Sequence, residues 1–391
     1  MKLAILTHEP FYPPSGGGSA ELIYLVNQLT SHNHDVHLFC PKFPDVNQVE
    51  KQFSIQVHPF KIWQMSRYTN FRLIKYLLYP FALRRLVKRT AKNIHFDVIL
   101  SQHAISSVAA GQLKTDLDIP VAMNFLDHLT GFMETWPRWI IPRFILKRLM
   151  QFELNLPCRY NANAVLTVSK ELCRRFIETG FDSSRIITIN YGYDSELFKL
   201  SKIKIKSSPT VVMHGSFDTH HLGEIATKSI YLIAKSRPEV RFLFVGKETK
   251  SLKNLSKKIR QKLPEANITC TGFIEYKTIS NKLIQGHVGI IPYEESAGSH
   301  CAFVAKMVEY AAVGLPVVST PLSGTKTFFS NEPSICFSKF DGKEFSADVL
   351  KMLDSPPQFN AIEKLAKRVE NELNWKTICN KVVNQLEALH P

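Results

Sequence analysis

The sequence of 391 residues lacks several features that would each indicate a particular class of protein. No uninterrupted apolar run reaches the length of a membrane-spanning helix, and the run from Leu3 to Leu6 is too brief for a signal peptide and fits a buried strand. The 7 cysteines are scattered and include no CxxC pair. We therefore expect reduced packing cysteines in a cytosolic protein, with neither a disulfide framework nor a metal site.

Two common phosphate-binding motifs are also missing. The glycine-rich stretch that follows the first predicted strand, from Pro13 to Ser19, matches neither GxGxxG nor GxxxxGK[ST]. A glycine-rich turn between a strand and a helix still directs helix N–H groups at an anion, and Gly17 and Gly18 are candidates for such a contact. A tight turn that binds nothing is the equally simple alternative.

Negative charge is scarce in this sequence. The formal net charge is +15, and no acidic residue occurs between Lys51 and Phe96. Nucleic acid, anionic lipid and a phosphorylated substrate would each balance such a charge. Because no helix-turn-helix, RNP or zinc-finger pattern is present, we do not expect a nucleic acid partner.

Two basic segments, residues 61–92 and 136–148, are rich in aromatic and aliphatic residues. This composition is typical of helices that lie on a membrane, with cations on anionic lipid and apolar side chains among the headgroups. It predicts a protein bound peripherally to the cytoplasmic face of a membrane, and ordinary amphipathic helices are the alternative. The predicted membrane-binding residues are Lys61, Arg67, Arg72, Lys75, Arg84, Arg85, Lys88, Arg89, Trp136 and Trp139.

Strand and helix patterns alternate through two successive parts of the chain. This alternation predicts an α/β protein with two doubly wound, Rossmann-like parallel sheets. The polar, basic stretch KLSKIKIKSSP has no clear core pattern and predicts a linker. We accordingly expect an N-terminal domain over 1–198, the linker at 199–209, a second domain over 210–374, and a last helix in 375–391 that crosses back to the first domain.

Two short stretches carry candidate chemistry. Lys306 and Glu309 share one face of a predicted helix that Gly314 ends, so they are placed to hold a phosphate and a pair of sugar hydroxyls, with a surface ion pair as the alternative. Asp127 and His128 follow a predicted strand, where open α/β sheets bind ligands. Asp127 is a candidate general base or a helix cap. His128 is a candidate contact for a donor substrate or for its phosphate.

In their order and spacing, several segments resemble those of GT-B glycosyltransferases, most closely family 4 (group 1) and its relatives. They are SGGGSAELIYLVNQL, HDVHLFCP, VLTVSKEL, RIITINYGYDSELF, FLFVGKE, ITCTGFIEY, HVGIIPY and KMVEYAAVGLPVVST. The resemblance implies two domains facing a central cleft, with a nucleotide diphosphate sugar on the C-terminal domain and the acceptor on the N-terminal one. No tightly bound cofactor is implied. We expect no metal requirement, because a lysine and helix N–H groups stabilise the leaving diphosphate.

The resemblance also assigns roles by position. Glu309 accepts hydrogen bonds from the ribose hydroxyls, Lys306 faces the diphosphate, and Tyr293 lies near the sugar or phosphate. Gly17 and Gly18 let their loop close on the donor.

The acidic residue that many members use as a base or sugar contact corresponds to Asp127. Three positions depart from the family pattern. Cys301 stands where a first glutamate usually precedes Glu309 by eight residues, the usual Arg and Lys are replaced within Ser216 to His221, and Tyr191 replaces the asparagine of an Asn-Gly turn. These departures leave open whether the anomeric configuration is retained or inverted.

The expected activity is therefore that of a hexosyltransferase-type glycosyltransferase. It moves a sugar from a nucleotide diphosphate sugar to a lipid-linked or cell-envelope glycan acceptor. A GT-B nucleotide-sugar epimerase, a phosphorylase and a noncatalytic membrane-docking descendant are the alternatives. The sequence does not identify the base, the sugar, the acceptor or the oligomeric state.

Overall fold

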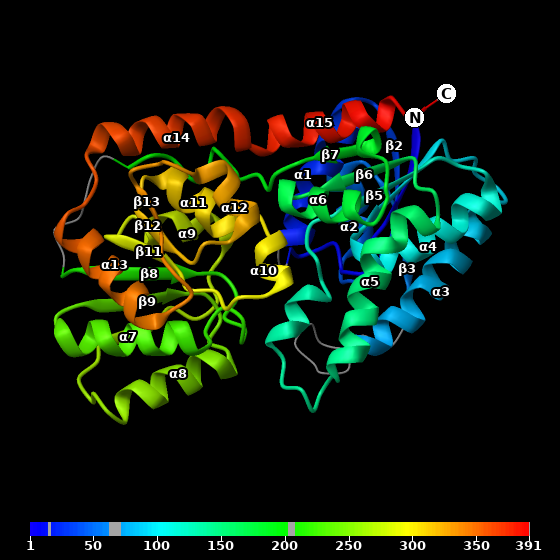
Figure 1. The fold of residues 1–391 in the computed structure, drawn as a ribbon. Helices are drawn as coiled ribbons and strands as arrows, with labels where there is room; N and C mark the ends of the chain where they lie inside the picture. The colour runs from blue at the N-terminus through cyan, green and yellow to red at the C-terminus, as the bar shows by residue number, and fades with distance from the viewer. Residues whose placement is uncertain (15–16, 62–71, 202–207, 391) are drawn as a thin grey trace. The chain divides into compact units, whose positions relative to one another are not determined.

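The computed structural model describes residues 1–14, 17–61, 72–201 and 208–390, with only the backbone for 72–76. The chain forms two compact units (Figure 1). The first unit consists of Met1–Met133, Pro137–Tyr191 and Trp375–Pro391. The second consists of Glu134–Trp136 and Gly192–Asn374. The first unit is thus built from both ends of the chain.

The first unit contains a parallel sheet with the strand order β3-β2-β1-β4-β5-β6-β7. Its strands are β1 (Lys2–Leu6), β2 (Asp35–Pro41), β3 (Gln56–Phe60), β4 (Val98–Gln102), β5 (Val121–Phe125), β6 (Ala164–Thr167) and β7 (Ile186–Thr188). The strand order reverses between β1 and β4. In open α/β sheets, ligands bind beyond the carboxyl ends of the strands at such a reversal.

Helices cover both faces of this sheet. Figure 1 shows α3, α4 and α5 on one side and α1 and α15 on the other. The helices of the first unit are α1 (Gly17–Ser31), α2 (Val46–Phe53), α3 (Arg72–Thr90), α4 (His103–Leu117), α5 (Arg143–Arg159), α6 (Lys170–Glu178) and α15 (Trp375–Glu387), with short 3₁₀ turns η1 (Gly131–Thr135) and η2 (Ser183–Arg185). The inner strands β1, β2, β4, β5 and β6 are almost wholly buried, as their continuous apolar runs require, whereas the edge strands β3 and β7 are partly exposed.

The last helix, α15, packs against α1. Its residues Trp375, Ile378, Val382 and Leu386 recur at helical spacing and are all buried. The Trp375 ring stacks on that of Tyr24 with 5.2 Å between their centroids. Burial of this apolar stripe attaches the C-terminal helix to the first unit.

The second unit repeats the architecture with a parallel sheet in the order β10-β9-β8-β11-β12-β13. Its strands are β8 (Thr210–His214), β9 (Arg241–Val245), β10 (Ile268–Cys270), β11 (Val288–Ile291), β12 (Val317–Ser319) and β13 (Ile335–Phe337). Its helices are α7 (Glu224–Ser236), α8 (Lys250–Arg260), α9 (Ile279–Leu283), α10 (Ala297–Cys301), α11 (Ala305–Val313), α12 (Ser323–Phe329), α13 (Gly342–Asp354) and α14 (Phe359–Leu373), with a 3₁₀ turn η3 (Tyr276–Thr278). α7, α8 and α13 lie on one side of the sheet, and α9 and α11 on the other (Figure 1).

The predicted fold class is confirmed, because both sheets are parallel and doubly wound. The strand β11 ends at Ile291, because Pro292 has no N–H to continue the ladder. The helix α1 begins at Gly17, within the glycine-rich stretch from Pro13 to Ser19. Tyr293 therefore lies in a loop just beyond a strand, in the region where such folds bind ligands.

Candidate active site

The candidate donor site of the second unit begins with Lys306, in the first turn of α11. Its side chain is buried, and Nζ donates a hydrogen bond to Tyr293 Oη at 2.9 Å. Burial lowers the pKa of this lysine from 10.5 to about 8, while the negative charges of Glu309 and Asp218 oppose the shift. At neutral pH the ammonium is thus charged but poorly solvated. Such a group gains strongly from a phosphate ligand.

One turn further along α11 lies Glu309, and side chains hold both of its carboxylate oxygens. Tyr276 Oη donates to Oε1 at 2.7 Å, and Nε2 of His214 makes a short contact with Oε2. His214 is the last residue of β8, and its backbone N–H donates to Tyr310 Oη at 3.1 Å. The carboxylate is therefore fixed in direction, as recognition of a pair of hydroxyls requires.

A glycine lets the chain after β8 approach Lys306. Gly215 has a φ of 96°, and a Cβ built there would lie 3.1 Å from Lys306 Cε and 3.3 Å from Nζ. A larger residue would be strained at this φ and would crowd the ammonium. The loop after β8 thus lies beside Lys306, the candidate phosphate-binding residue, through its backbone and not through an Arg or Lys side chain.

The same loop brings three potential metal ligands together. One ligand atom from each of Asp218, His220 and His221 lies within 4.8 Å of the others. The His221 ring packs 4.5 Å from that of Tyr293, and its Nδ1 accepts a hydrogen bond from the Asp218 backbone N–H at 3.2 Å. That bond occupies the Nδ1 lone pair, so a metal at this nitrogen would have to displace it.

The structure buries one of the departures from the family pattern. Cys301, at the position of the usual first glutamate, ends α10 and is fully buried. The nearby Glu294 accepts a hydrogen bond from Ile225 N–H at 2.9 Å, so its carboxylate contacts the first turn of α7. Burial raises its pKa. This contact gives Glu294 a structural role at a helix N-terminus.

In the first unit, Asp127 and His128 follow β5, as predicted. Asp127 is half-buried. The His128 ring is fully buried, with Nε2 3.9 Å from a Glu153 oxygen. Burial lowers the pKa of His128 from 6.5 to about 3, so the imidazole is neutral. His128 therefore belongs to the interior of the first unit.

Glu153 of α5 holds the backbone that follows Asp127. Its two oxygens accept hydrogen bonds from the N–H groups of Leu129 and Thr130, at 2.9 and 2.8 Å, and from the Thr130 hydroxyl. Burial raises the pKa of Glu153 from 4.5 to about 7 against the lowering effect of these bonds. Sequence reasoning missed this residue, since a glutamate 26 positions after Asp127 gives no local signal.

The glycine loop leads into a second polar cluster of the first unit. A Cβ on Gly18 would lie 2.6 Å from His103 Nε2, and the Gly18 carbonyl accepts a hydrogen bond from Gln102 at 2.8 Å. Gln102 and Asn124 both donate to Glu21, at 2.7 and 2.8 Å. Packing against His103 thus explains why residue 18 is a glycine. The closure of the loop on a donor through Gly17 and Gly18 stays a prediction.

Comparison with known proteins gives the family. Residues 15–197 match the model of Glycosyltransferase Family 4, and residues 208–355 match that of Glycosyl transferases group 1. The chain belongs to the group 1 glycosyltransferases. The family predicted from the sequence is confirmed, and with it the identification of the chain as a glycosyltransferase enzyme.

Two curated relatives are similar to this glycosyltransferase. One component of the phosphatidylinositol N-acetylglucosaminyltransferase of Homo sapiens is 21% identical over 387 residues, which are 95% of this chain and 73% of that protein. TuaH of Bacillus subtilis (strain 168), named as a teichuronic acid biosynthesis glycosyltransferase, is 24% identical over 194 residues. That match covers 48% of this chain and only 47% of TuaH, so it spans about half of each protein.

Solved structures show that the glycosyltransferase has the GT-B fold. Sucrose-phosphate synthase of Thermosynechococcus elongatus superposes with a TM-score of 0.81 at 16% identity, covering 99% of this chain and 98% of the other. Anabaena HepE in complex with UDP-glucose gives 0.74 at 16% identity, covering 99% and 100%. These superpositions establish the fold, and at 16% identity they do not indicate the substrate.

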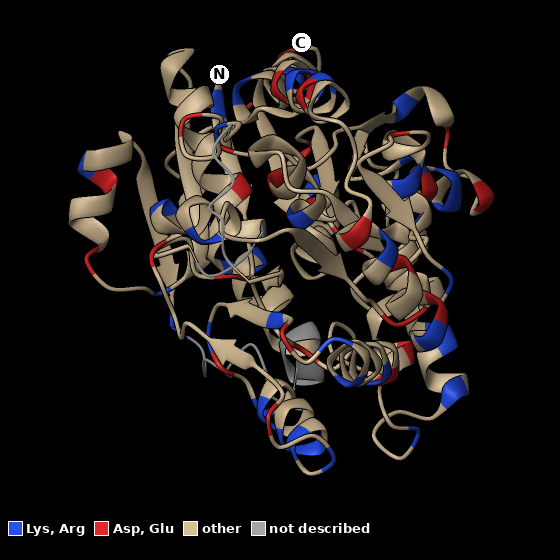
Figure 2. Ribbon diagram, turned by 90° about the vertical axis from the view of Figure 1, so that its left-hand side faces the viewer, with Lys and Arg blue, Asp and Glu red and all other residues tan. Residues whose placement is uncertain are grey.

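The predicted membrane-binding residues of this glycosyltransferase lie in the first unit where they are described, except for Trp136, which belongs to the second unit. Arg67 is outside the described residues, and the side chains of Arg72 and Lys75 are not described. Lys61, Arg85, Lys88, Arg89 and Trp139 are exposed, while Arg84 and Trp136 are partly buried. Figure 2 shows lysines and arginines interspersed with acidic residues along the ribbon.

Large apolar side chains are exposed on the same two segments. Leu77 and Phe81 of α3 are 77% and 66% exposed, and Trp139, just before α5, and Phe144, in its first turn, are 82% and 66% exposed. Part of the basic charge is compensated, because Asp116 of α4 pairs with Arg84 and Lys88. Among the described helices, none combines the length and apolar character needed to cross a bilayer.

Proposed function

We propose that this glycosyltransferase moves a sugar from a nucleotide diphosphate sugar to a lipid-linked or cell-envelope glycan acceptor. The observation that carries the proposal is the pair on α11, a buried ammonium at Lys306 next to a directed carboxylate at Glu309. Lys306 would bind the diphosphate and stabilise its growing charge as the sugar leaves, and Glu309 would accept the ribose hydroxyls. Tyr293, which touches Lys306, would lie beside the phosphate or sugar.

Two comparisons support a nucleotide-sugar donor. HepE, which shares the fold, binds UDP-glucose, and the human relative is named as part of an N-acetylglucosaminyltransferase. We propose that the transfer proceeds without a metal cofactor, because Lys306 supplies the positive charge. In this proposal Asp127 serves as the base that accepts the proton of the acceptor hydroxyl.

The decisive first experiment is a thermal-shift screen of the full chain against UDP, GDP, ADP and their sugar conjugates, with and without EDTA. A ligand at about a hundred times its dissociation constant should stabilise the protein by about 2.7 kcal/mol. A selective, EDTA-insensitive shift that disappears in Lys306→Ala supports the donor site. Lack of any shift, or the same shift in Lys306→Ala, would overturn the assignment of the site.

Transfer itself is measured with the donor that the screen selects. Asp127→Asn should lower the rate by at least about a hundredfold, as loss of a general base does, while leaving the melting temperature and the donor shift intact. Conversion of the nucleotide sugar to an isomer without any acceptor would instead indicate an epimerase. Full transfer activity in Asp127→Asn would exclude this residue as the base.

We further propose that the acceptor is presented at the cytoplasmic face of a membrane, to which α3 and the start of α5 bind. Exposed aromatic and aliphatic side chains next to cations support this, since the lipid headgroup layer accommodates both kinds of group together. Flotation with anionic vesicles should recover the protein, and neutral vesicles should not. Arg85→Glu with Lys88→Glu should abolish flotation, whereas Lys257→Glu with Lys258→Glu on α8 makes the same charge change as a control. Equal flotation of both variants would contradict the assignment.

A further inference from the structure

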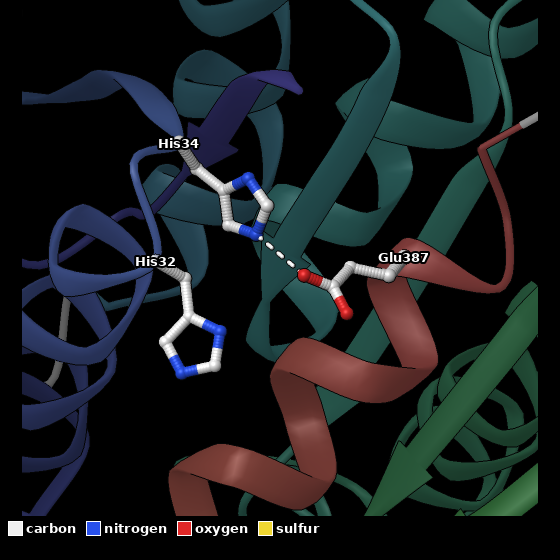
Figure 3. Close-up of side chains that lie close together, drawn as sticks. All are labelled: His32, His34 and Glu387. Atoms are coloured by element: carbon white, nitrogen blue, oxygen red, sulfur yellow. Dashed lines mark hydrogen bonds and ion pairs between the residues drawn. The ribbon is translucent and has the colours of Figure 1, made fainter.

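A group of histidine and glutamate side chains in the first unit has no role in the proposed transfer. His32 and His34 lie in the turn between α1 and β2, and Glu387 is the last residue of α15 (Figure 3). One ligand atom from each lies within 4.8 Å of the others. Two stretches more than 350 positions apart in the chain therefore converge on one point.

The turn that carries the two histidines is held by its own backbone. Asn33 has a φ of 61°, in the left-handed region that asparagine tolerates. The His34 N–H donates to the Leu29 carbonyl at 3.1 Å, and the Asn33 N–H donates to Thr30 at 3.0 Å. This is the Schellman pattern of a helix C-terminus, so His32 and His34 have fixed backbone positions on either side of Asn33.

The helix that carries Glu387 is held on α1 by further contacts, one of them through Gln28, whose Nε2 also lies 3.1 Å from His32 Nε2. Gln28 of α1 donates a hydrogen bond to Asn380 of α15 at 2.7 Å, and Asn380 lies on α15 before Glu387. Leu386, the neighbour of Glu387, is fully buried. The glutamate thus projects from a helix whose register on α1 is already set.

The side chains are arranged as metal ligands are. His34 Nε2 lies 3.0 Å from a Glu387 oxygen, and the His34 ring is almost buried whereas the glutamate is 44% exposed. Figure 3 shows a ring nitrogen of His32 also directed toward the Glu387 carboxylate.

We propose that His32, His34 and Glu387 bind a Zn²⁺ ion that fastens the last turn of α15 to the turn between α1 and β2. Two imidazole nitrogens and one carboxylate oxygen are typical zinc ligands. In a tetrahedral site such atoms lie about 3.4 Å apart, so small side-chain rotations would bring the three together. The ion would replace the proton now shared by His34 and Glu387. Because His32 and Glu387 are exposed, water would complete the coordination.

The test is titration of the full chain, purified without a histidine tag and stripped with EDTA, with Zn²⁺ and with Co²⁺ as a spectroscopic probe. Wild type should bind one equivalent that His32→Ala and Glu387→Gln each weaken by at least about tenfold. His95→Ala, which removes another histidine of the same unit, should bind as wild type does. A second equivalent that Asp218→Asn removes would belong to the other histidine group.

Hydrogen exchange distinguishes a fastening site from incidental surface binding. Zn²⁺ should slow exchange of the amides in the last turn of α15 in wild type and in His95→Ala, and leave it unchanged in Glu387→Gln. Absence of zinc binding, unchanged affinity in both ligand variants, or binding without protection of α15 would each overturn the proposal. Since neither ligand variant removes a buried side chain, both should fold, and their melting temperatures without metal check this.

Discussion

Each unit of the molecule buries one histidine next to one glutamate, and the two pairs differ instructively. In the first unit His128 and Glu153 are 0% and 2% exposed, and in the second His214 and Glu309 are 4% and 6% exposed. The residue types and degree of burial are nearly the same. What differs is the chemical nature of the groups that hold each glutamate.

Two backbone N–H groups and the Thr130 hydroxyl hold Glu153, whereas side chains alone hold Glu309. The N–H groups of Leu129 and Thr130 donate to Glu153, and they cannot leave without unfolding the loop. Tyr276 donates to Glu309 through its hydroxyl, which can rotate away when a ligand hydroxyl arrives. A buried carboxylate held by the backbone thus fixes structure, whereas one held by side chains remains able to exchange partners with a ligand.

The two pairs also differ in nearby positive charge. Lys306 lies on the same helix face as Glu309, one turn away, and the negative charge of Glu309 favours the protonated form of the lysine. No lysine contributes to the shifted pKa of Glu153, for which burial is the largest cause. The pair in the second unit thus combines a carboxylate with a buried lysine on one helix face, as binding of a sugar diphosphate requires.

The largest expected effect comes from removing that cation. Lys306→Ala should lower kcat/KM for transfer about 10²- to 10³-fold, because the leaving diphosphate loses its main stabilising charge. Steady-state kinetics measure this, and the melting temperature should not fall, since a poorly solvated ammonium is removed. Lys326→Ala, at an exposed lysine of α12, is the matched control. A loss of less than tenfold would remove Lys306 from the donor site.

An intermediate effect is expected on the pH dependence of stability through Glu153. Its pKa is raised from 4.5 to about 7, so its stabilising contribution is present below about pH 4.5 and is lost as pH rises through 7. The difference in unfolding free energy between wild type and Glu153→Gln should therefore shrink by up to about 3 kcal/mol between pH 4.5 and 8.

Urea denaturation at several pH values measures this difference. Glu178→Gln, which changes an exposed glutamate of α6, is the control for the substitution itself. If the Glu153→Gln difference is constant over this pH range, Glu153 is ionised throughout, and burial does not outweigh its hydrogen bonds.

The smallest effect is expected at Tyr276. Tyr276→Phe removes one hydrogen bond to Glu309 and should lower stability by about 1 kcal/mol. Because a donor hydroxyl would take the same place, the dissociation constant for the nucleotide should change less than about fivefold. Calorimetric titration measures both variants, with Tyr231→Phe on α7 as the control. A change as large as that of Lys306→Ala would assign Tyr276 a direct contact with the donor.

The sequence predicts the architecture well because it depends on local periodicity. Alternating strand and helix patterns predict the two parallel sheets. Lys306 and Glu309 are near each other because residues three positions apart lie on the same face of a helix. Long-range contacts escape this reasoning. His214 and Tyr276 reach Glu309 from 95 and 33 positions away, and only the sheet order brings them there.

Burial is the other property that motif reading cannot supply. His128 follows a strand just as a ligand-binding residue would, yet its ring is fully enclosed. The positive charge of the segment between Lys51 and Phe96, which has no acidic residues, is likewise partly compensated, since the fold brings Asp116 to Arg84 and Lys88. Both differences arise from packing between segments, which a linear pattern does not contain.

The composition of the first unit from both ends of the chain has a consequence for synthesis on the ribosome. Residues Gly192–Asn374 are contiguous and precede α15, so nearly all of the second unit is synthesised before α15. The first unit, although begun earlier, lacks α15 until that helix is synthesised, and until then the part of α1 around Tyr24, which stacks on Trp375, is open to solvent. The half that is translated first is thus the half completed last, and during that interval it is the nascent segment most exposed to chaperones and proteases.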